Sequence, residues 1–183
     1  MKFEDFDFGE KYQDAHLSRV DLPQETLEKI IEWNRKPQNF LIFCGNPGVG
    51  KTYLCAALCK ECLDRKQPVY YLTEHQYFNK LRSVIQRDWD YEFEIKKLCE
   101  YPFVIIDDIG SSQMTEWQKE VLFSFVDLRS RNNFPTFLTS NFFIDDFREK
   151  FHSRFVSRLL DRRNTVIELN WIDKRRGIHA DIA

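Results

Sequence analysis

Short apolar runs alternate with stretches of helical periodicity along most of this chain. The runs are continuous and bounded by polar or turn residues, and they predict strands at 39–43, 69–73, 102–108, 136–141 and 165–169. Helical patterns lie at 53–65, 74–87, 91–100, 115–131, 144–150 and 152–161. Continuous apolar strands separated by helices indicate a parallel sheet that is covered on both faces. We therefore predict an α/β fold with a five-stranded parallel sheet and helices on both faces.

Polar residues follow three of the predicted strands. A glycine-rich segment follows the first strand, Asp107 and Asp108 end the third, and Asn141 ends the fourth. Right-handed crossovers bring the carboxyl ends of parallel strands to one edge of the sheet, where such folds bind ligands. We expect these polar residues to meet at that edge.

The glycine-rich segment satisfies the phosphate-binding pattern G-x-x-x-x-G-K-[ST] at a strand-to-helix junction. The predicted cofactor-binding residues are Gly45, Asn46, Pro47, Gly48, Val49, Gly50, Lys51, Thr52 and Tyr53. The glycines let backbone N–H groups approach phosphates, and the Lys51 ammonium can reach the β- and γ-oxygens. The Thr52 hydroxyl can hold Mg²⁺. The segment predicts binding of a nucleoside triphosphate.

Two acids and an amide join Lys51 as candidate catalytic groups. Asp107 has the position of the acid that holds Mg²⁺ beside a phosphate loop, and Asp108 can polarise the attacking water. A pair of acids at a strand end also suits a helix cap. Many ATPases have Glu where this chain has Asp108, so we expect slow hydrolysis. Asn141 is predicted to contact the γ-phosphate or the attacking water, and ordinary turn chemistry is its alternative.

Two arginines lie four residues apart on the last predicted helix, so Arg154 and Arg158 face the same side. That side is suited to present an arginine finger to the nucleotide of a neighbouring subunit, with Arg158 the stronger candidate. A surface ion pair with Glu149 or Asp161 is the alternative.

Composition and charge limit the classes of function. With 183 residues and 43% hydrophobic content, the chain can bury the core of one domain. The net charge is −2, yet 146–176 is basic, which suits either phosphates and nucleic acid or a solvated helix face. No apolar run can span a bilayer and the acidic start does not fit a secretory signal, so we expect a cytoplasmic protein with no membrane partner. The cysteines lack metal-ligand spacing, and Cys55, Cys59 and Cys62 are expected to be packing residues.

Together these residues resemble the AAA+ ATPase domain of the DnaC/DnaI-type bacterial replicative helicase loaders, with the transposition helper IstB as a close relative. The resemblance spans nearly the whole chain. Segments 45–52 and 105–110 are similar to the Walker A and Walker B motifs of the family, 138–141 to its sensor-1 strand, and 153–159 to its arginine-finger box. The aromatic segment 3–6, the helical stretch between 73 and 102, and Asn170-Trp171 at the close of the last strand also fit.

The resemblance implies a DNA-replication ATPase that binds ATP and Mg²⁺. It also implies ATP-dependent homo-oligomers in which Arg158 completes the site of the next subunit, and hydrolysis that depends on assembly or DNA. The implied partners are a replicative DNA helicase and single-stranded DNA. Candidate DNA contacts are Tyr77, Phe78, Lys80, Arg82 and Arg87, although aromatic residues at Tyr77 and Phe78 also suit a core.

Two departures affect the expected organisation, one from typical AAA+ proteins and one from the loaders. Few residues follow 169, so no separate helical lid domain is expected, as in these loaders, and Arg175 or Arg176 is the candidate substitute for a lid arginine. The resemblance implies that the chain begins where the ATPase domain of the loaders begins, so we expect it to differ from them in the amino-terminal domain that grips the helicase. We expect a single domain made of an acidic and aromatic segment with the first helix at 1–38, and an AAA+ core at 39–183.

Three other functions stay open. An IstB-like ATPase would assist transposition, and neighbouring genes would separate it from a loader. An interaction protein that blocks a helicase loader would act without ATP turnover. A nucleotide kinase would need an acceptor pocket and an arginine-rich lid, and the Asn141 pattern argues against it.

Overall fold

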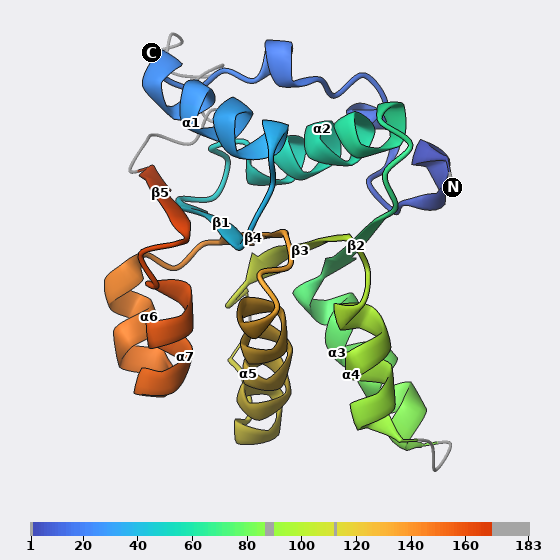
Figure 1. Ribbon diagram of the computed structural model, residues 1–183, viewed down its shortest axis with the longest axis vertical. Helices are drawn as coiled ribbons and strands as arrows, with labels where there is room; N and C mark the ends of the chain where they lie inside the picture. The colour runs from blue at the N-terminus through green and yellow to red at the C-terminus, as the bar shows by residue number, and fades with distance from the viewer. Residues whose placement is uncertain (1, 87–89, 112, 170–183) are drawn as a thin grey trace, which may run out of the picture.

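A five-stranded parallel sheet lies between two layers of helices (Figure 1). The computed structural model describes residues 2–86, 90–111 and 113–169. The strands are β1 (Phe40–Gly45), β2 (Val69–Thr73), β3 (Phe103–Ile109), β4 (Thr136–Ser140) and β5 (Thr165–Leu169). Their order is β2-β3-β4-β1-β5, and each neighbouring pair is parallel. The predicted α/β fold is confirmed.

The early helices cover one face of the sheet and the later helices cover the other (Figure 1). The first layer holds η1 (Phe3–Asp5), η2 (Glu10–Tyr12), η3 (Leu17–Arg19), α1 (Gln24–Arg35) and α2 (Lys51–Asp64). The second holds α3 (Glu74–Ile85), α4 (Tyr91–Cys99), α5 (Glu116–Arg131), α6 (Ile144–Lys150) and α7 (Ser153–Leu159). Within the described ranges, no group of helices stands apart from the sheet as a lid, and no helix is long and apolar enough to cross a membrane.

Side chains of β1 point alternately into two buried clusters. Phe40, Ile42 and Cys44 belong to the cluster on the side of α3 to α7, whereas Leu41 and Phe43 belong to the cluster on the side of α1 and α2. All of these side chains are almost completely buried. Because both faces of the strand lie against helices, its sequence is a continuous apolar run.

The N-terminal segment packs on the same face as α2. Phe8, Ala15 and Leu17 are buried in one cluster with residues of α2. The ring centroid of Phe8 lies 4.0 Å from that of Tyr71 in β2. Residues before α1 thus share a core with the sheet, and the division between 38 and 39 stays a prediction.

Threonines start two of the helices that follow strands. The Thr73 hydroxyl accepts from the Gln76 N–H at 3.2 Å, and the Gln76 side chain accepts from the Thr73 N–H at 2.9 Å. Thr115 and Gln118 form the same reciprocal pair at the start of α5. These capping boxes satisfy N–H groups that a helix start leaves unpaired, so they define where α3 and α5 begin.

Two of the predicted DNA contacts are core residues. Tyr77 is fully buried and donates from its hydroxyl to the Val121 carbonyl at 3.0 Å, and Phe78 is 2% exposed. The ring of Tyr77 packs edge-on against Phe125 of α5. The prediction that Tyr77 and Phe78 stack on DNA bases is therefore wrong, because α3 directs both rings at α5 instead of at solvent.

The cations proposed for DNA binding have different surroundings. Lys80 pairs with Glu94 at 2.9 Å, whereas Arg82 is exposed on α3. Arg87 lies outside the described residues, as do Arg175, Arg176 and the Asn170-Trp171 pair. The predictions for these residues stay predictions.

All five cysteines are buried and free. Burial raises the pKa of Cys44 and of Cys62 to about 12, so neither thiol ionises near neutral pH. The predicted packing role of Cys55, Cys59 and Cys62 is confirmed, since each is at most 1% exposed.

Candidate functional site

The loop between β1 and α2 turns through two glycines in the left-handed region. Gly48 has a φ of 88° and Gly50 a φ of 100°. Residues with a Cβ adopt such angles only with strain. Gly50 is the N-cap of α2, so Lys51 and Thr52 are the first helical residues. The N–H groups of a first helical turn lack intrahelical acceptors and carry partial positive charge, so this loop is suited to phosphate.

Lys51 lies folded into this loop and is 7% exposed. Its ammonium donates to the Gly45 carbonyl at 2.7 Å and to the Asn46 carbonyl at 3.0 Å. It also donates to Asn141 Oδ1 at 2.7 Å. The lysine therefore connects the glycine-rich loop to the end of β4.

The Asn141 amide joins Lys51 to Asp108. Its Nδ2 donates to Asp108 Oδ1 at 2.5 Å, while its oxygen accepts from the lysine. An amide suits this position because it presents an acceptor to the ammonium and a donor to the carboxylate. The structure thus brings three of the predicted catalytic residues into one hydrogen-bonded chain.

A bulge in β3 directs the two acids. Between Ile106 and Ile109, β3 carries one more residue than the facing stretch of β4. Asp108 has a φ of 65°, in the left-handed region. Bulges and left-handed residues re-aim side chains, and they cluster at functional sites. Here Asp107 is 2% exposed inside the sheet, while the adjacent Asp108 lines an open hollow.

Hydroxyls from both neighbouring strands hold Asp107. The Thr139 hydroxyl of β4 donates to Asp107 Oδ1, and the Tyr71 hydroxyl of β2 donates to Oδ2 at 3.3 Å. Sequence reasoning missed Tyr71 and Thr139, because both are ordinary strand residues in the sequence. Only the pairing of strands places them beside Asp107.

Asp108 has a perturbed acidity. Burial raises the pKa of its carboxyl, and the neighbouring charge of Asp107 raises it further. The ammonium of Lys51 and the hydrogen bond from Asn141 act in the opposite direction. A carboxylate with a raised pKa is a better proton acceptor than an exposed aspartate, as a group that polarises water needs to be.

A hollow of about 400 Å³ opens over the loop. It is lined by Lys11, Tyr12, Pro47, Gly48, Gly50, Lys51, Thr52, Tyr53, Asp108 and Asn141. Sequence reasoning missed Lys11 and Tyr12, because the 3₁₀ helix η2 has no periodic signal. The ring centroids of Tyr12 and Tyr53 lie 6.4 Å apart, and Lys11 and Tyr12 both line the hollow. The N-terminal segment therefore forms one wall of the hollow.

Two other predicted loop residues lie under or behind the hollow. Val49 is 2% exposed and packs into the core beneath the loop. At Gly45 an added Cβ would lie 2.7 Å from the Leu169 carbonyl oxygen, so the close contact of β1 with β5 requires glycine there.

The residues present fit a Mg²⁺ site that is completed by substrate. Thr52 lines the hollow, and Asp107 is a buried acid near the carboxyl end of β3. Across the described ranges, no group of three or more His, Cys, Asp or Glu side chains could hold a metal alone. Mg²⁺ is ordinarily held by one or two protein oxygens together with phosphate and water, which this donor set allows.

The two arginines of α7 face α5. Arg158 Nε donates to Asp127 Oδ1 at 2.7 Å, and the Arg154 guanidinium lies 5.2 Å from the Phe123 ring centroid. The ion pair is formed with Asp127, not with Glu149 or Asp161 as the alternative expected. Neither arginine lines the hollow over the phosphate loop of its own chain, and the Arg158 side chain is 41% exposed.

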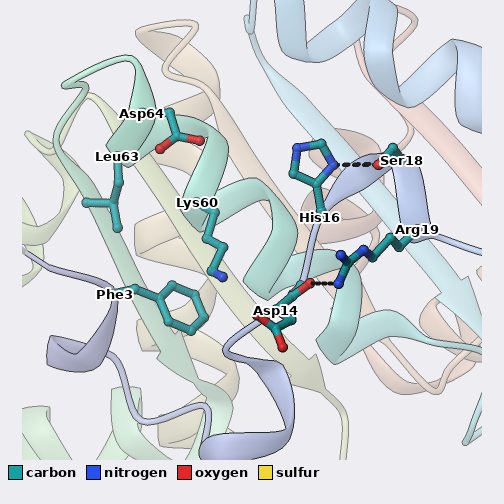
Figure 2. A pocket seen from close by; sticks show the side chains of 9 residues that line it. Phe3, Asp14, His16, Ser18, Arg19, Lys60, Leu63 and Asp64 are labelled. Atoms are coloured by element: carbon teal, nitrogen blue, oxygen red, sulfur yellow. Dashed lines mark hydrogen bonds between the residues drawn. The ribbon is translucent and has the colours of Figure 1, made fainter.

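A larger hollow of about 570 Å³ lies between the N-terminal segment and the C-terminal half of α2 (Figure 2). Acids and bases are mixed along its wall, with Asp14 and Asp64 beside Arg19 and Lys60. It contains no residue of the phosphate loop. The smaller hollow is the candidate nucleotide site, because the loop glycines and Lys51 lie there.

Comparisons with known proteins identify relatives of this chain. The family model described as IstB-like ATP binding protein matches residues 1–169. The replicative helicase loader DnaI of Bacillus subtilis (strain 168) is 30% identical over 148 residues, which is 78% of this chain and 47% of DnaI. The replicative helicase loader DnaC of Escherichia coli (strain K12) is 26% identical over 138 residues, which is 75% of this chain and 56% of DnaC.

A solved structure has the same fold. The crystal structure of the DnaC helicase loader superposes with a TM-score of 0.76 at 22% identity, covering 88% of this chain and 99% of that one. The chain spans about half the length of the two curated relatives. Because the family model matches residues 1–169 of the 183, the chain belongs to the family of IstB-like ATP binding proteins.

Proposed function

We propose that this protein is an AAA+ ATPase of DNA replication that binds and hydrolyses ATP and loads or remodels the replicative DNA helicase on single-stranded DNA. The observation that carries the proposal is the hydrogen-bonded chain from Lys51 through Asn141 to Asp108. It connects a phosphate-binding loop to a water-polarising acid through an amide able to respond to the γ-phosphate. A protein that only bound nucleotide would not need such a connection.

Each residue of the site then has a distinct role. Loop N–H groups and the Lys51 ammonium bind the phosphates, with the nucleoside against Lys11 and Tyr12. Thr52 and Asp107 would hold Mg²⁺, which neutralises phosphate charge when bound. Asp108 polarises the attacking water, helped by its raised pKa. An aspartate has a shorter side chain than the glutamate of many ATPases, so we expect slow turnover.

The site is proposed to be completed by a neighbouring subunit. Arg158 and Arg154 lie away from the hollow of their own chain, so they can act only in trans. Arg158 is partly exposed and must exchange its partner Asp127 for a phosphoryl oxygen of the adjacent protomer. A guanidinium delivered in this way stabilises charge on the transferred phosphoryl group. Hydrolysis would therefore depend on an ATP-bound homo-oligomer.

The helicase and DNA partners are proposed from the relatives. DnaI and DnaC are named replicative helicase loaders, and the chain matches about half of each. Exposed Arg82 and the basic stretch 146–176 supply cations for single-stranded DNA.

A direct test mixes the protein with its cognate replicative helicase, ATP and single-stranded DNA. Complex formation is followed by light scattering on a sizing column, and hydrolysis by phosphate release. We expect a helicase complex and DNA-stimulated hydrolysis, both lost in Lys51→Ala and kept in the control Lys36→Ala, an exposed lysine after α1. Absence of both the complex and the hydrolysis would refute the loader function. A complex that forms equally well with Lys51→Ala would indicate a blocking protein.

A second candidate is an ATPase that assists transposition, which the match to the IstB-like model favours. A competition experiment separates the two functions. The protein is offered equal amounts of the helicase and of a transposase encoded beside it. Capture of the transposase alone would favour the second candidate.

A further inference from the structure

Glu74 is a buried acid that none of the roles above uses. It is the first residue of α3 and is 2% exposed. Its Oε2 accepts a hydrogen bond from the backbone N–H of Gly110. The bond joins the start of α3 to the end of β3, across positions 36 residues apart in the sequence.

Gly110 belongs to the turn that ends the β3 bulge. Its φ is 80°, and the φ of Asp108 is 65°, so two residues of this short stretch are left-handed. The Ser111 N–H donates to the Asp108 carbonyl at 3.2 Å and closes the turn. A Cβ added at Gly110 would lie 2.2 Å from Phe142 Cε2, so the turn is also confined by packing. The Gly110 N–H points to Glu74, which therefore holds the turn from the side of α3.

We infer that Glu74 is a positioning residue for Asp108. By accepting from Gly110, its carboxylate keeps the bulged turn in the conformation that aims Asp108 at Asn141. The inference rests on the proposed hydrolysis, because aiming Asp108 matters only if that acid polarises water. Glu74 itself lines no part of the hollow over the phosphate loop, so it acts through the turn and not on the substrate.

A purely structural role for Glu74 makes different predictions. Acids at a helix start stabilise the helix through its dipole, and Glu74 lies at such a position. The capping box of Thr73 and Gln76 already satisfies the first turn of α3. Gln76→Ala weakens this cap without touching Gly110 and is therefore the matched control.

The test compares Glu74→Leu, Glu74→Gln and Gln76→Ala in the full chain. Leucine removes the acceptor, and we expect turnover to fall about tenfold while ATP affinity changes less than about twofold. Glutamine keeps an oxygen acceptor and should restore most of the turnover. Gln76→Ala should lower the melting temperature while turnover stays at the wild-type value.

A second readout does not depend on hydrolysis. Hydrogen exchange of the Gly110 amide, followed by NMR, should accelerate at least about tenfold in Glu74→Leu and stay unchanged in Gln76→Ala. If wild-type protein hydrolyses ATP but Glu74→Leu turns over and exchanges normally, the inference is overturned and the proposed function stands. If wild-type protein does not hydrolyse ATP, the proposed function fails. Normal exchange of the Gly110 amide in Glu74→Leu would then also overturn the inference that Glu74 holds the turn.

Discussion

Replacing Asn141 tests the central chain of hydrogen bonds. Asn141→Leu keeps a side chain of similar size but removes the acceptor for Lys51 and the donor to Asp108. Lys51 keeps its bonds to the Gly45 and Asn46 carbonyls, so the loop should hold its shape. ATP affinity is therefore expected to change less than about threefold.

The magnitude of the catalytic effect follows from the bond to Asp108. A hydrogen bond to a charged group contributes about 1.5–3 kcal/mol, and the lower end applies because Asn141 is only half-buried. A loss of about 1.4 kcal/mol in transition-state stabilisation lowers turnover about tenfold. This reduction should be visible in single-turnover phosphate release at saturating ATP.

The direction in which the acid limb of the pH profile moves is an independent test of the same bond. The bond from Asn141 favours ionised Asp108, so its removal raises a pKa that burial has already raised. Activity requires the carboxylate and is lost as the pH falls through that pKa, so the acid limb should move to higher pH. Asn141→Asp keeps an acceptor for Lys51 but faces Asp108 with a second charge, so it should move the limb further. Unchanged turnover and an unmoved limb in Asn141→Leu would refute the role of the chain.

Three further substitutions probe the core and the surroundings of the site. Arg129 is fully buried, and in Arg129→Met the carbonyls of Cys99, Tyr101 and Pro135 lose their donor. The free energy of unfolding should fall by about 3 kcal/mol in urea titrations, and a loss below about 1 kcal/mol would contradict this. Tyr71→Phe removes the hydroxyl that bonds Asp107 and should raise the Mg²⁺ concentration for half-maximal hydrolysis about threefold, whereas an unchanged Mg²⁺ dependence would argue against this role of Tyr71. Gly110→Ala should cost about 2 kcal/mol of stability in thermal unfolding, since φ is 80° and the new Cβ meets Phe142; wild-type stability would show that the turn can relax.

The sequence predicts the elements of the site because each carries a local signal. The apolar run of β1 followed by the glycine-lysine pattern identifies the loop, and the polar ends of β3 and β4 identify Asp108 and Asn141. The parallel arrangement then places the strand ends at one edge. No contact between distant residues is needed for these steps.

Other features depend on register or on tertiary packing, which the sequence does not encode locally. The extra residue in β3 can be recognised only from the pairing of β3 with β4. The Tyr71 hydroxyl beside Asp107 can be recognised only from the pairing of β3 with β2. The prediction for Tyr77 and Phe78 was wrong because adjacent aromatic residues on α3 are both directed at α5. The partner of Arg158 was missed because Asp127 lies on a different helix, 31 residues away in the sequence.

Each active site is proposed to be shared by two subunits, and mixed assemblies of two variants test this sharing. Asp108→Asn lacks the acid of its own site, and Arg158→Ala lacks the arginine supplied to a neighbour, so each variant alone should be inactive. Mixed in equal amounts, they should recover about a quarter of wild-type hydrolysis, because random assembly joins an intact acid to an intact arginine at one interface in four. A mixture as inactive as either variant alone would contradict the shared site.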